Sequence, residues 1–86
     1  MVSVDRDRLV ETASALVNVP SFTGDEEQAA RLMVEIYESL GLQVQWQQVE
    51  EGRANALGIW PGAGGGKSLM FNGHLDTSYS GREPWL

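Results

Sequence analysis

Hydrophobic and polar residues follow two different periods along the chain, and each period predicts a different element. Over residues 5–18 the apolar positions have the three-then-four spacing of one helix face. They are Leu9, Val10, Ala13, Leu16 and Val17. The same spacing returns over residues 24–40, where the apolar positions are Ala29, Leu32, Met33, Ile36 and Leu40. Two amphipathic helices are therefore predicted, each with one face in the core.

Residues at the predicted helix ends indicate where each helix begins and stops. Ser3 or Asp5 is placed to cap the first helix, because a short polar side chain can accept a hydrogen bond from a free backbone N–H. Thr23 and Glu26 have the spacing of a capping box for the second helix. Gly41 follows that helix and suits the left-handed backbone conformation that closes a helix.

Strict alternation of apolar and polar residues over 42–47 predicts a strand with one buried face, at or near a sheet edge. A polar turn over 49–53 separates it from a second strand-like segment, residues 54–60. Trp46 and Trp60 lie in these two segments. Both indoles are expected to pack in the core or on the sheet, because buried aromatic rings supply contact area.

The run Leu69-Met70-Phe71 is short and uncharged, and it is preceded by a glycine-rich loop. This pattern predicts a strand that is buried on both faces. Because side chains alternate along a strand, His74 and Asp76 are expected on one side, beyond the carboxyl end, with Leu75 turned toward the core. A neutral imidazole is a good metal ligand, and a nearby carboxylate can orient its ring. His74 is thus a candidate metal ligand, with Asp76 as its partner.

The predicted helices and strands indicate an α/β fold. The 86 residues form one domain at most, because so short a chain buries only about two-thirds of the surface that its unfolded form exposes. A hydrophobic fraction of 42% and a charged fraction of 21% argue against intrinsic disorder. A large enclosed active site is difficult to build from this chain.

Charge and cysteine content narrow the classes of partner. The formal net charge of -6, from 12 acidic and 6 basic residues, disfavours nucleic acid and anionic membranes. There is no cysteine, so a metal would have to be bound by histidine and carboxylate groups. The N-terminus lacks the order of a signal peptide and no apolar run reaches membrane-spanning length, so a cytoplasmic location is expected.

The glycine-rich loop offers a competing hypothesis of nucleotide binding. The segment 62–68 is similar to a phosphate-binding loop, but that motif needs a glycine where this chain has Pro61. The motif also opens a helix, whereas Lys67 is followed by the strand-like run. Nucleotide binding is therefore disfavoured, and it would require a phosphate contact at Lys67.

Four short motifs occur in order along the chain: a Pro-Ser turn within 19–26, Gly-Leu-x-Val at 41–44, Arg-x-Asn at 53–55 and Gly-His-x-Asp at 73–76. In this order the chain resembles the N-terminal part of the M20 metallopeptidase family. That family includes acetylornithine deacetylase, succinyl-diaminopimelate desuccinylase, aminoacylase-1 and carboxypeptidase G2. The resemblance covers essentially the whole chain.

The resemblance implies a metal-dependent amidohydrolase that cleaves an amide bond in N-acyl amino acids or small peptides through a metal-activated water. His74 matches the family's first metal ligand, and Asp76 matches the catalytic-site carboxylate that holds this histidine or tunes its ion. The cofactor implied is a pair of divalent ions, zinc or cobalt, bridged by an aspartate. Thr77 departs from the pattern, since many relatives have valine there, and this leaves the subfamily open.

The resemblance also implies that most of the site lies elsewhere. The bridging aspartate, a Glu-Glu pair that carries the general base and the remaining ligands are expected beyond Leu86. Residues 1–86 are accordingly expected to be an incomplete piece of a zinc-exopeptidase-like catalytic domain, inactive alone, with the dimerisation domain absent. Under this resemblance the two helices pack on part of a mixed sheet. Exposed apolar surface on such a fragment is expected to promote self-association into a homo-oligomer.

A second hypothesis comes from a different class of protein. The chain can instead be a small non-catalytic α+β interaction module, in which His74 and Asp76 only form a hydrogen bond at the end of a strand. Cooperative unfolding that metal ions do not shift would favour this alternative.

Overall fold

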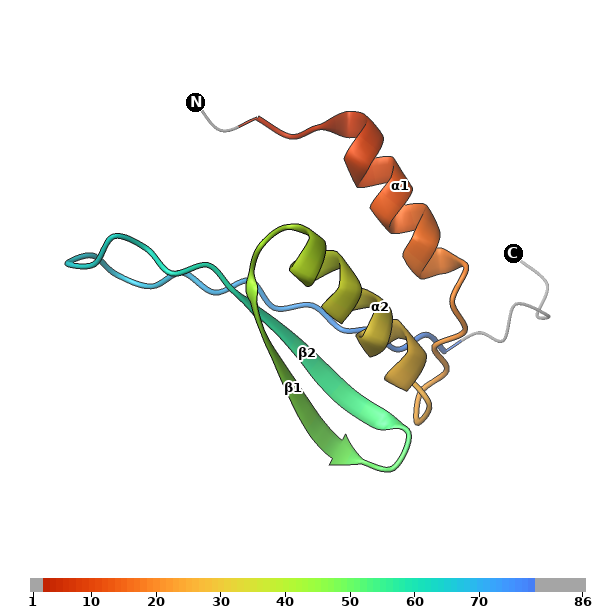
Figure 1. Cartoon of the computed structure of the whole chain (residues 1–86). Coiled ribbons are helices and arrows are strands. Elements are labelled where there is room, and N and C mark those ends of the chain that lie inside the picture. Colours follow the sequence, from red (N-terminus) through yellow and green to blue (C-terminus); the bar gives the residue numbers. More distant parts are fainter. Residues whose placement is uncertain (1–2, 79–86) are drawn as a thin grey trace.

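The computed structural model describes residues 3–78 of the chain. Its elements in order are the helices α1 (Arg6–Val17) and α2 (Glu27–Ser39) and the strands β1 (Gln43–Glu50) and β2 (Arg53–Ile59). Figure 1 shows α2 lying along the hairpin of β1 and β2, with α1 beside α2. The described residues thus form a small α+β arrangement. None of the described helices is both long enough and apolar enough to cross a bilayer.

Helix α1 forms as predicted but buries none of its residues. The Asp5 side chain accepts a hydrogen bond from the backbone N–H of Arg8 at 3.1 Å. Of the two candidate caps, Ser3 and Asp5, the structure therefore selects Asp5. The predicted apolar face remains open, with Leu9 58% exposed and Val17 83% exposed. The prediction that this face lies in the core is therefore wrong within residues 3–78, because α1 contacts the rest of the fold mainly through α2.

Helix α2 begins three residues later than predicted. Gly24 has a φ of 98°, and Glu26 has φ -92° and ψ 3° with no side-chain capping bond, so the backbone becomes helical only at Glu27. The predicted capping box is wrong, since the side chains of Thr23 and Glu26 bind other partners. At the other end Gly41 has a φ of 78° and closes the helix as predicted.

Strands β1 and β2 pair antiparallel, with Trp46 opposite Ala56 in the register. The described residues contain this two-stranded sheet and not the mixed sheet that was expected. Small residues on β2 allow α2 to pack closely over it. Ala54 is buried, and a Cβ atom built on Gly58 would lie 2.8 Å from the Cγ atom of Tyr37. The core of this fold is therefore the contact between α2 and the hairpin.

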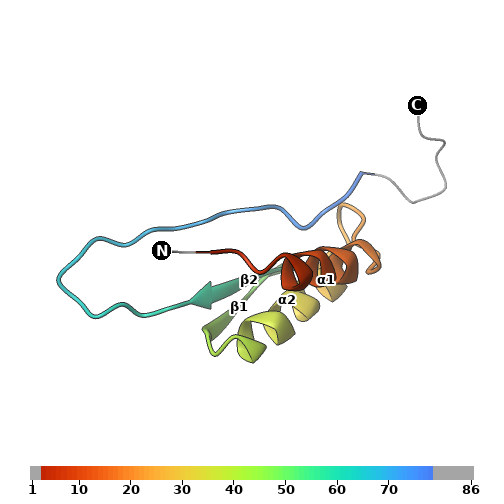
Figure 2. The ribbon, with the colours of Figure 1, turned by 90° about the horizontal axis from the view of Figure 1, so that it is seen from above.

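The predicted strand at Leu69-Met70-Phe71 does not form. These three residues lie in an extended segment that pairs with no described strand, and they are 80%, 77% and 89% exposed. Figure 2 shows this segment running apart from the hairpin on its way back from the glycine-rich loop. A strand buried on both faces needs paired neighbours and a covering layer on each side. Residues 3–78 supply neither for this run.

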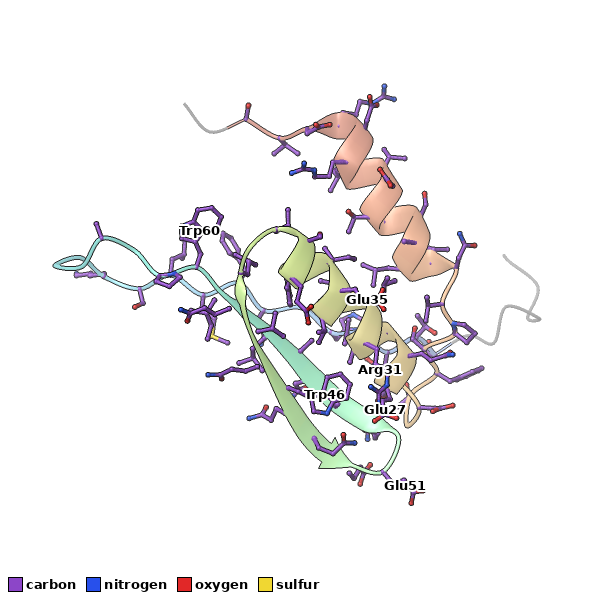
Figure 3. The ribbon with its side chains drawn as sticks, viewed as in Figure 1. Glu27, Arg31, Glu35, Trp46, Glu51 and Trp60 are labelled. Atoms are coloured by element: carbon purple, nitrogen blue, oxygen red, sulfur yellow. The ribbon has the colours of Figure 1, made fainter. Side chains whose placement is uncertain are left out.

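The two tryptophans differ in their surroundings. Trp46 is 37% exposed, and the guanidinium carbon of Arg31 lies 5.1 Å from the centre of its ring, as Figure 3 illustrates. Its Nε1 atom donates a hydrogen bond to Oε1 of Gln48 at 2.9 Å. Trp60 follows the end of β2 and is 76% exposed. Packing on the sheet is thus seen for Trp46, and the same prediction for Trp60 is wrong.

Candidate metal-binding site

The side chains of His74 and Asp76 meet at the end of the extended segment. Nδ1 of His74 lies 3.0 Å from Oδ1 of Asp76 and 3.0 Å from the backbone oxygen of the same residue. Because an ionised carboxylate only accepts hydrogen bonds, Nδ1 is the donor in the side-chain contact. The His74 side chain is 86% exposed. The pair therefore lies on one side, as predicted, and Nε2 is the ring nitrogen left for a further ligand.

The second oxygen of the Asp76 carboxylate is bound by Thr23. The hydroxyl of Thr23 donates to Oδ2 of Asp76 at 2.7 Å. This hydrogen bond, followed by that from His74, lowers the pKa of Asp76 below its ordinary value, because both donors favour the charged form. Asp76 is thus held ionised, with one donor on each oxygen.

Two backbone hydrogen bonds join this end of the extended segment to the loop between α1 and α2. The N–H of Thr77 donates to the carbonyl oxygen of Ser21 at 2.7 Å, and the N–H of Thr23 donates to that of Thr77 at 3.1 Å. Phe22 and Thr77 accordingly form an isolated parallel bridge. The loop and residues 76–77 are fixed against each other by main-chain contacts, which places Thr23 beside Asp76.

The same loop is attached to the hairpin by Glu26, which is 6% exposed. Its Oε2 atom accepts a hydrogen bond from Nε of Arg53 at 2.9 Å, and its Oε1 atom accepts one from the N–H of Gly24 at 2.6 Å. The Arg53 contact, then the Gly24 contact, lowers the pKa of Glu26. Nη1 of Arg53 also lies 3.2 Å from Oε1 of Glu50. An ionised carboxylate thus ties the loop to the start of β2.

Sequence reasoning did not find the partners Thr23, Glu26 and Arg53. Thr23 and Asp76 are 53 positions apart, and Glu26 and Arg53 are 27 positions apart. No periodic pattern connects positions so distant, and an acid near a helix N-terminus has an adequate local explanation. The ordered motifs at 19–26 and 53–55 were the available signal, because they contain these residues.

The residues present fit one ligand position of a metal centre. His74 offers Nε2 on an exposed ring whose other nitrogen is held by a carboxylate, which is the usual support of a ligating histidine. A catalytic zinc ion needs three protein ligands. Across residues 3–78, no group of three histidine, cysteine, aspartate or glutamate side chains lies close enough to hold an ion. These residues therefore do not form a complete centre.

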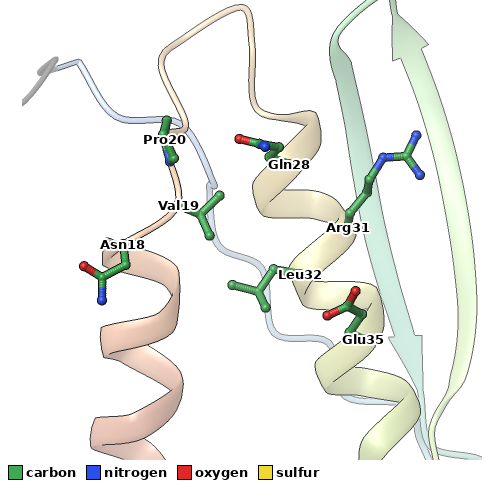
Figure 4. Close-up of a pocket in the computed structure, with 7 residues that line it drawn as sticks. All are labelled: Asn18, Val19, Pro20, Gln28, Arg31, Leu32 and Glu35. Atoms are coloured by element: carbon green, nitrogen blue, oxygen red, sulfur yellow. The ribbon is translucent and has the colours of Figure 1, made fainter.

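A pocket lies elsewhere, between the end of α1 and the outer face of α2. It has a volume of about 320 Å³, and Figure 4 shows its lining of Asn18, Val19, Pro20, Gln28, Arg31, Leu32 and Glu35. Arg31 within it also pairs with Glu27, at 3.5 Å. Neither His74 nor Asp76 lines this pocket. The His74 ring is instead exposed at the surface.

The glycine-rich loop does not have the structure of a phosphate-binding loop. Gly64 and Gly65 adopt φ values of 93° and 80°, and no helix follows Lys67 among the described residues. A phosphate-binding loop depends on the N-terminus of the helix that follows it. The backbone therefore lacks the feature that the nucleotide hypothesis needs at this loop.

No protein-family model and no solved structure matches the chain. A function for it must therefore be argued from the sequence motifs and from the geometry of His74, Asp76 and Thr23.

Proposed function

We propose that His74 supplies one ligand, through Nε2, to a divalent-metal centre of an amide-cleaving hydrolase of the M20 type. Asp76 orients the imidazole and keeps the proton on Nδ1. The observation that carries this proposal is the 3.0 Å contact between Nδ1 of His74 and Oδ1 of Asp76, made by a ring that is 86% exposed. A buried ring, or one directed away from the acid, would not support it.

The chemistry of the pair favours a metal ligand over a simple surface hydrogen bond. A histidine that binds a metal commonly donates its other N–H to a carboxylate, which fixes the tautomer and raises the basicity of the ligating nitrogen. The resemblance to the M20 family implies zinc, with cobalt as the alternative, and histidine and carboxylate groups are established zinc ligands. Such an ion supplies a Lewis acid that polarises a carbonyl group and makes water more acidic. The other ligands and the general base come from groups outside residues 3–78.

The ordered motifs supply the substrate class, an amide bond in N-acyl amino acids or small peptides. The net charge of -6 makes nucleic acid and anionic membranes poor partners. Under this proposal the 86 residues contribute binding and orientation and do not carry out hydrolysis alone.

Zinc titration followed by NMR of the imidazole tests the proposed ligand. His74 is the single histidine of the sequence, so every imidazole signal belongs to it. Zn²⁺ is expected to shift the ring signals, and Asp76→Asn is expected to weaken zinc binding by about 10-fold to 100-fold, the usual effect of losing a carboxylate behind a ligating histidine. Asp7→Asn, an acid on α1, is the matched control and should leave the affinity unchanged. Equal affinities for Asp76→Asn and the original chain would refute the role of Asp76.

The coding sequence downstream of residue 86 tests the family assignment separately. The proposal expects an aspartate, a Glu-Glu pair and a late histidine there, which would supply the bridge, the base and the remaining ligands. A stop codon directly after this position would count against an M20-type enzyme.

A non-catalytic interaction module is the second candidate, and one observation favours it. Leu69, Met70 and Phe71 expose between 77% and 89% of their surface on an extended backbone that pairs with no strand within residues 3–78. Such a segment can add to the edge of another sheet. Under this candidate the unfolding transition is unaffected by Zn²⁺, whereas the metal-ligand proposal requires the folded chain to be stabilised by the ion.

A further inference from the structure

Asp76 receives a different donor on each carboxylate oxygen. The Thr23 hydroxyl donates to Oδ2 at 2.7 Å, and Nδ1 of His74 lies 3.0 Å from Oδ1. We propose that Thr23 is a positioning residue, whose hydroxyl holds the Asp76 carboxylate in the orientation that keeps the His74 proton on Nδ1 and leaves Nε2 to bind a metal ion. This inference rests on the proposed function for its metal, but its geometric part can be tested without one.

The Thr23 hydroxyl is held in place by the backbone on both sides of it. The N–H of Thr23 donates to the carbonyl oxygen of Thr77, and the N–H of Thr77 donates to that of Ser21. The next residue, Gly24, donates its N–H to Glu26, whose carboxylate is in turn bound by Arg53. The hydroxyl is therefore presented to Asp76 by a loop that is attached to both the extended segment and the hairpin.

The local backbone does not fix the Asp76 carboxylate by itself. Its side chain is 35% exposed, so water can compete for either oxygen. Rotation of the carboxylate about its terminal bond would move Oδ1 away from His74, and that torsion is intrinsically broad. A second donor on Oδ2 opposes this rotation. Removing the Thr23 hydroxyl is thus expected to loosen the His74 contact two hydrogen bonds away.

The tautomer of His74 is the readout that separates positioning from general support of the loop. Nitrogen-15 NMR of the ring in the 86-residue chain, at pH about 8.5 where free imidazole is neutral, reports which nitrogen holds the proton. The original chain is expected to hold it on Nδ1. A ring that holds its proton on Nε2 would overturn the proposal without any variant.

Two substitutions of Thr23 and one control complete the test. Thr23→Val keeps the shape but removes the hydroxyl, and it is expected to shift the tautomer toward Nε2–H and to weaken Zn²⁺ binding by about 10-fold, as for other partners behind a ligating histidine. Thr23→Ser restores the donor and should recover both the tautomer and most of the affinity. Thr12→Val makes the same change on α1 and should alter neither.

The outcomes separate this inference from the proposed function. If Zn²⁺ binds through His74 but folded Thr23→Val keeps the Nδ1–H tautomer and the affinity, the inference fails alone. If Thr23→Val switches the tautomer while Zn²⁺ does not perturb the ring, positioning holds and the metal proposal fails. If Thr23→Val unfolds, as its circular dichroism would show, Thr23→Ser decides, because a serine variant that is folded but has lost the Nδ1–H tautomer overturns the inference.

Discussion

Arg53 and Glu26 form an ion pair that joins the hairpin to the loop before α2, with Nε of Arg53 donating to Oε2 of Glu26 over 2.9 Å. The Glu26 side chain is only 7% exposed, whereas that of Arg53 is 38% exposed. Beside this pair the N–H of Glu27 donates to the carbonyl oxygen of Gly52 at 3.1 Å. The loop that carries Thr23 is therefore anchored to the hairpin as well as to Asp76, and the stability of that anchor should be measurable.

Glu26→Gln is expected to reduce the free energy of unfolding by about 1.5–3 kcal/mol, the usual range for a hydrogen bond to a charged group. The amide keeps the shape of the side chain but loses the charge that Arg53 and the Gly24 N–H bind. Urea unfolding provides the measurement. Glu27→Gln is the control, because its pair with Arg31 is more exposed and longer at 3.5 Å and should be worth about 0.5 kcal/mol or less. Equal effects from the two substitutions would contradict the role of Glu26.

Stability is expected to fall as the pH is lowered from about 5 to about 3. The pKa of Glu26 and the pKa of Asp76 are both lower in the folded chain than their ordinary values of about 4.3 and 3.9, so the unfolded chain binds more protons in this range. The stabilisation is complete above the ordinary values and is lost as the pH falls through the lowered ones. Urea unfolding at several pH values gives the unfolding free energy as a function of pH. That free energy should change less with pH for Glu26→Gln than for Glu27→Gln. If the unfolding free energy of Glu26→Gln depended on pH as strongly as that of Glu27→Gln, Glu26 would not contribute to the pH dependence of stability.

Gly58→Ala is expected to destabilise the fold by about 1–3 kcal/mol, the usual cost of overpacking. The new Cβ atom would lie 2.8 Å from Cγ of Tyr37 and 2.9 Å from Cδ1 of Leu42, so α2 would have to move away from β2. Thermal unfolding by circular dichroism measures the loss. Gly62→Ala is the matched control, since its Cβ would meet no atom within 4 Å, and it should be neutral or stabilising by up to about 1 kcal/mol.

Phe71→Asp is expected to reduce self-association of the chain without lowering its stability. Phe71 is 89% exposed, so a charge there costs little in the single chain but opposes apolar contact between copies. Sedimentation velocity at several concentrations gives the measurement. Val17→Asp adds the same charge at a site that is 83% exposed on α1, and it tests whether association depends on the segment around Phe71. If the two variants reduced self-association equally, association would depend on exposed apolar side chains in general and not on the segment around Phe71.

The hairpin illustrates what local pattern can and cannot predict. Alternation over 42–47 indicated a strand, and β1 (Gln43–Glu50) contains most of that range. The pattern did not show that β2 would be covered by α2 through small residues, because close approach depends on which helix face meets the strand. The need for glycine at position 58 becomes clear only from the structure, because Tyr37 lies too close to leave room for a Cβ atom.

The run Leu69-Met70-Phe71 shows that an apolar composition alone does not predict a buried strand. Its apolar side chains favour burial, but burial needs partners on both sides, and residues 3–78 leave this segment extended and exposed. The relation between His74 and Asp76 was nevertheless predictable, because residues two apart in an extended backbone share a side whether or not that backbone is paired.

By itself, the sequence determined the features whose causes lie within a few residues. These are the two helices, the presence of a polar cap before α1, the left-handed closure at Gly41 and the meeting of His74 with Asp76. Only the tertiary structure decided which side chains support that pair. Thr23 reaches Asp76, and Glu26 reaches Arg53, because the chain folds back on itself, and a contact between positions so far apart leaves no periodic trace in the sequence.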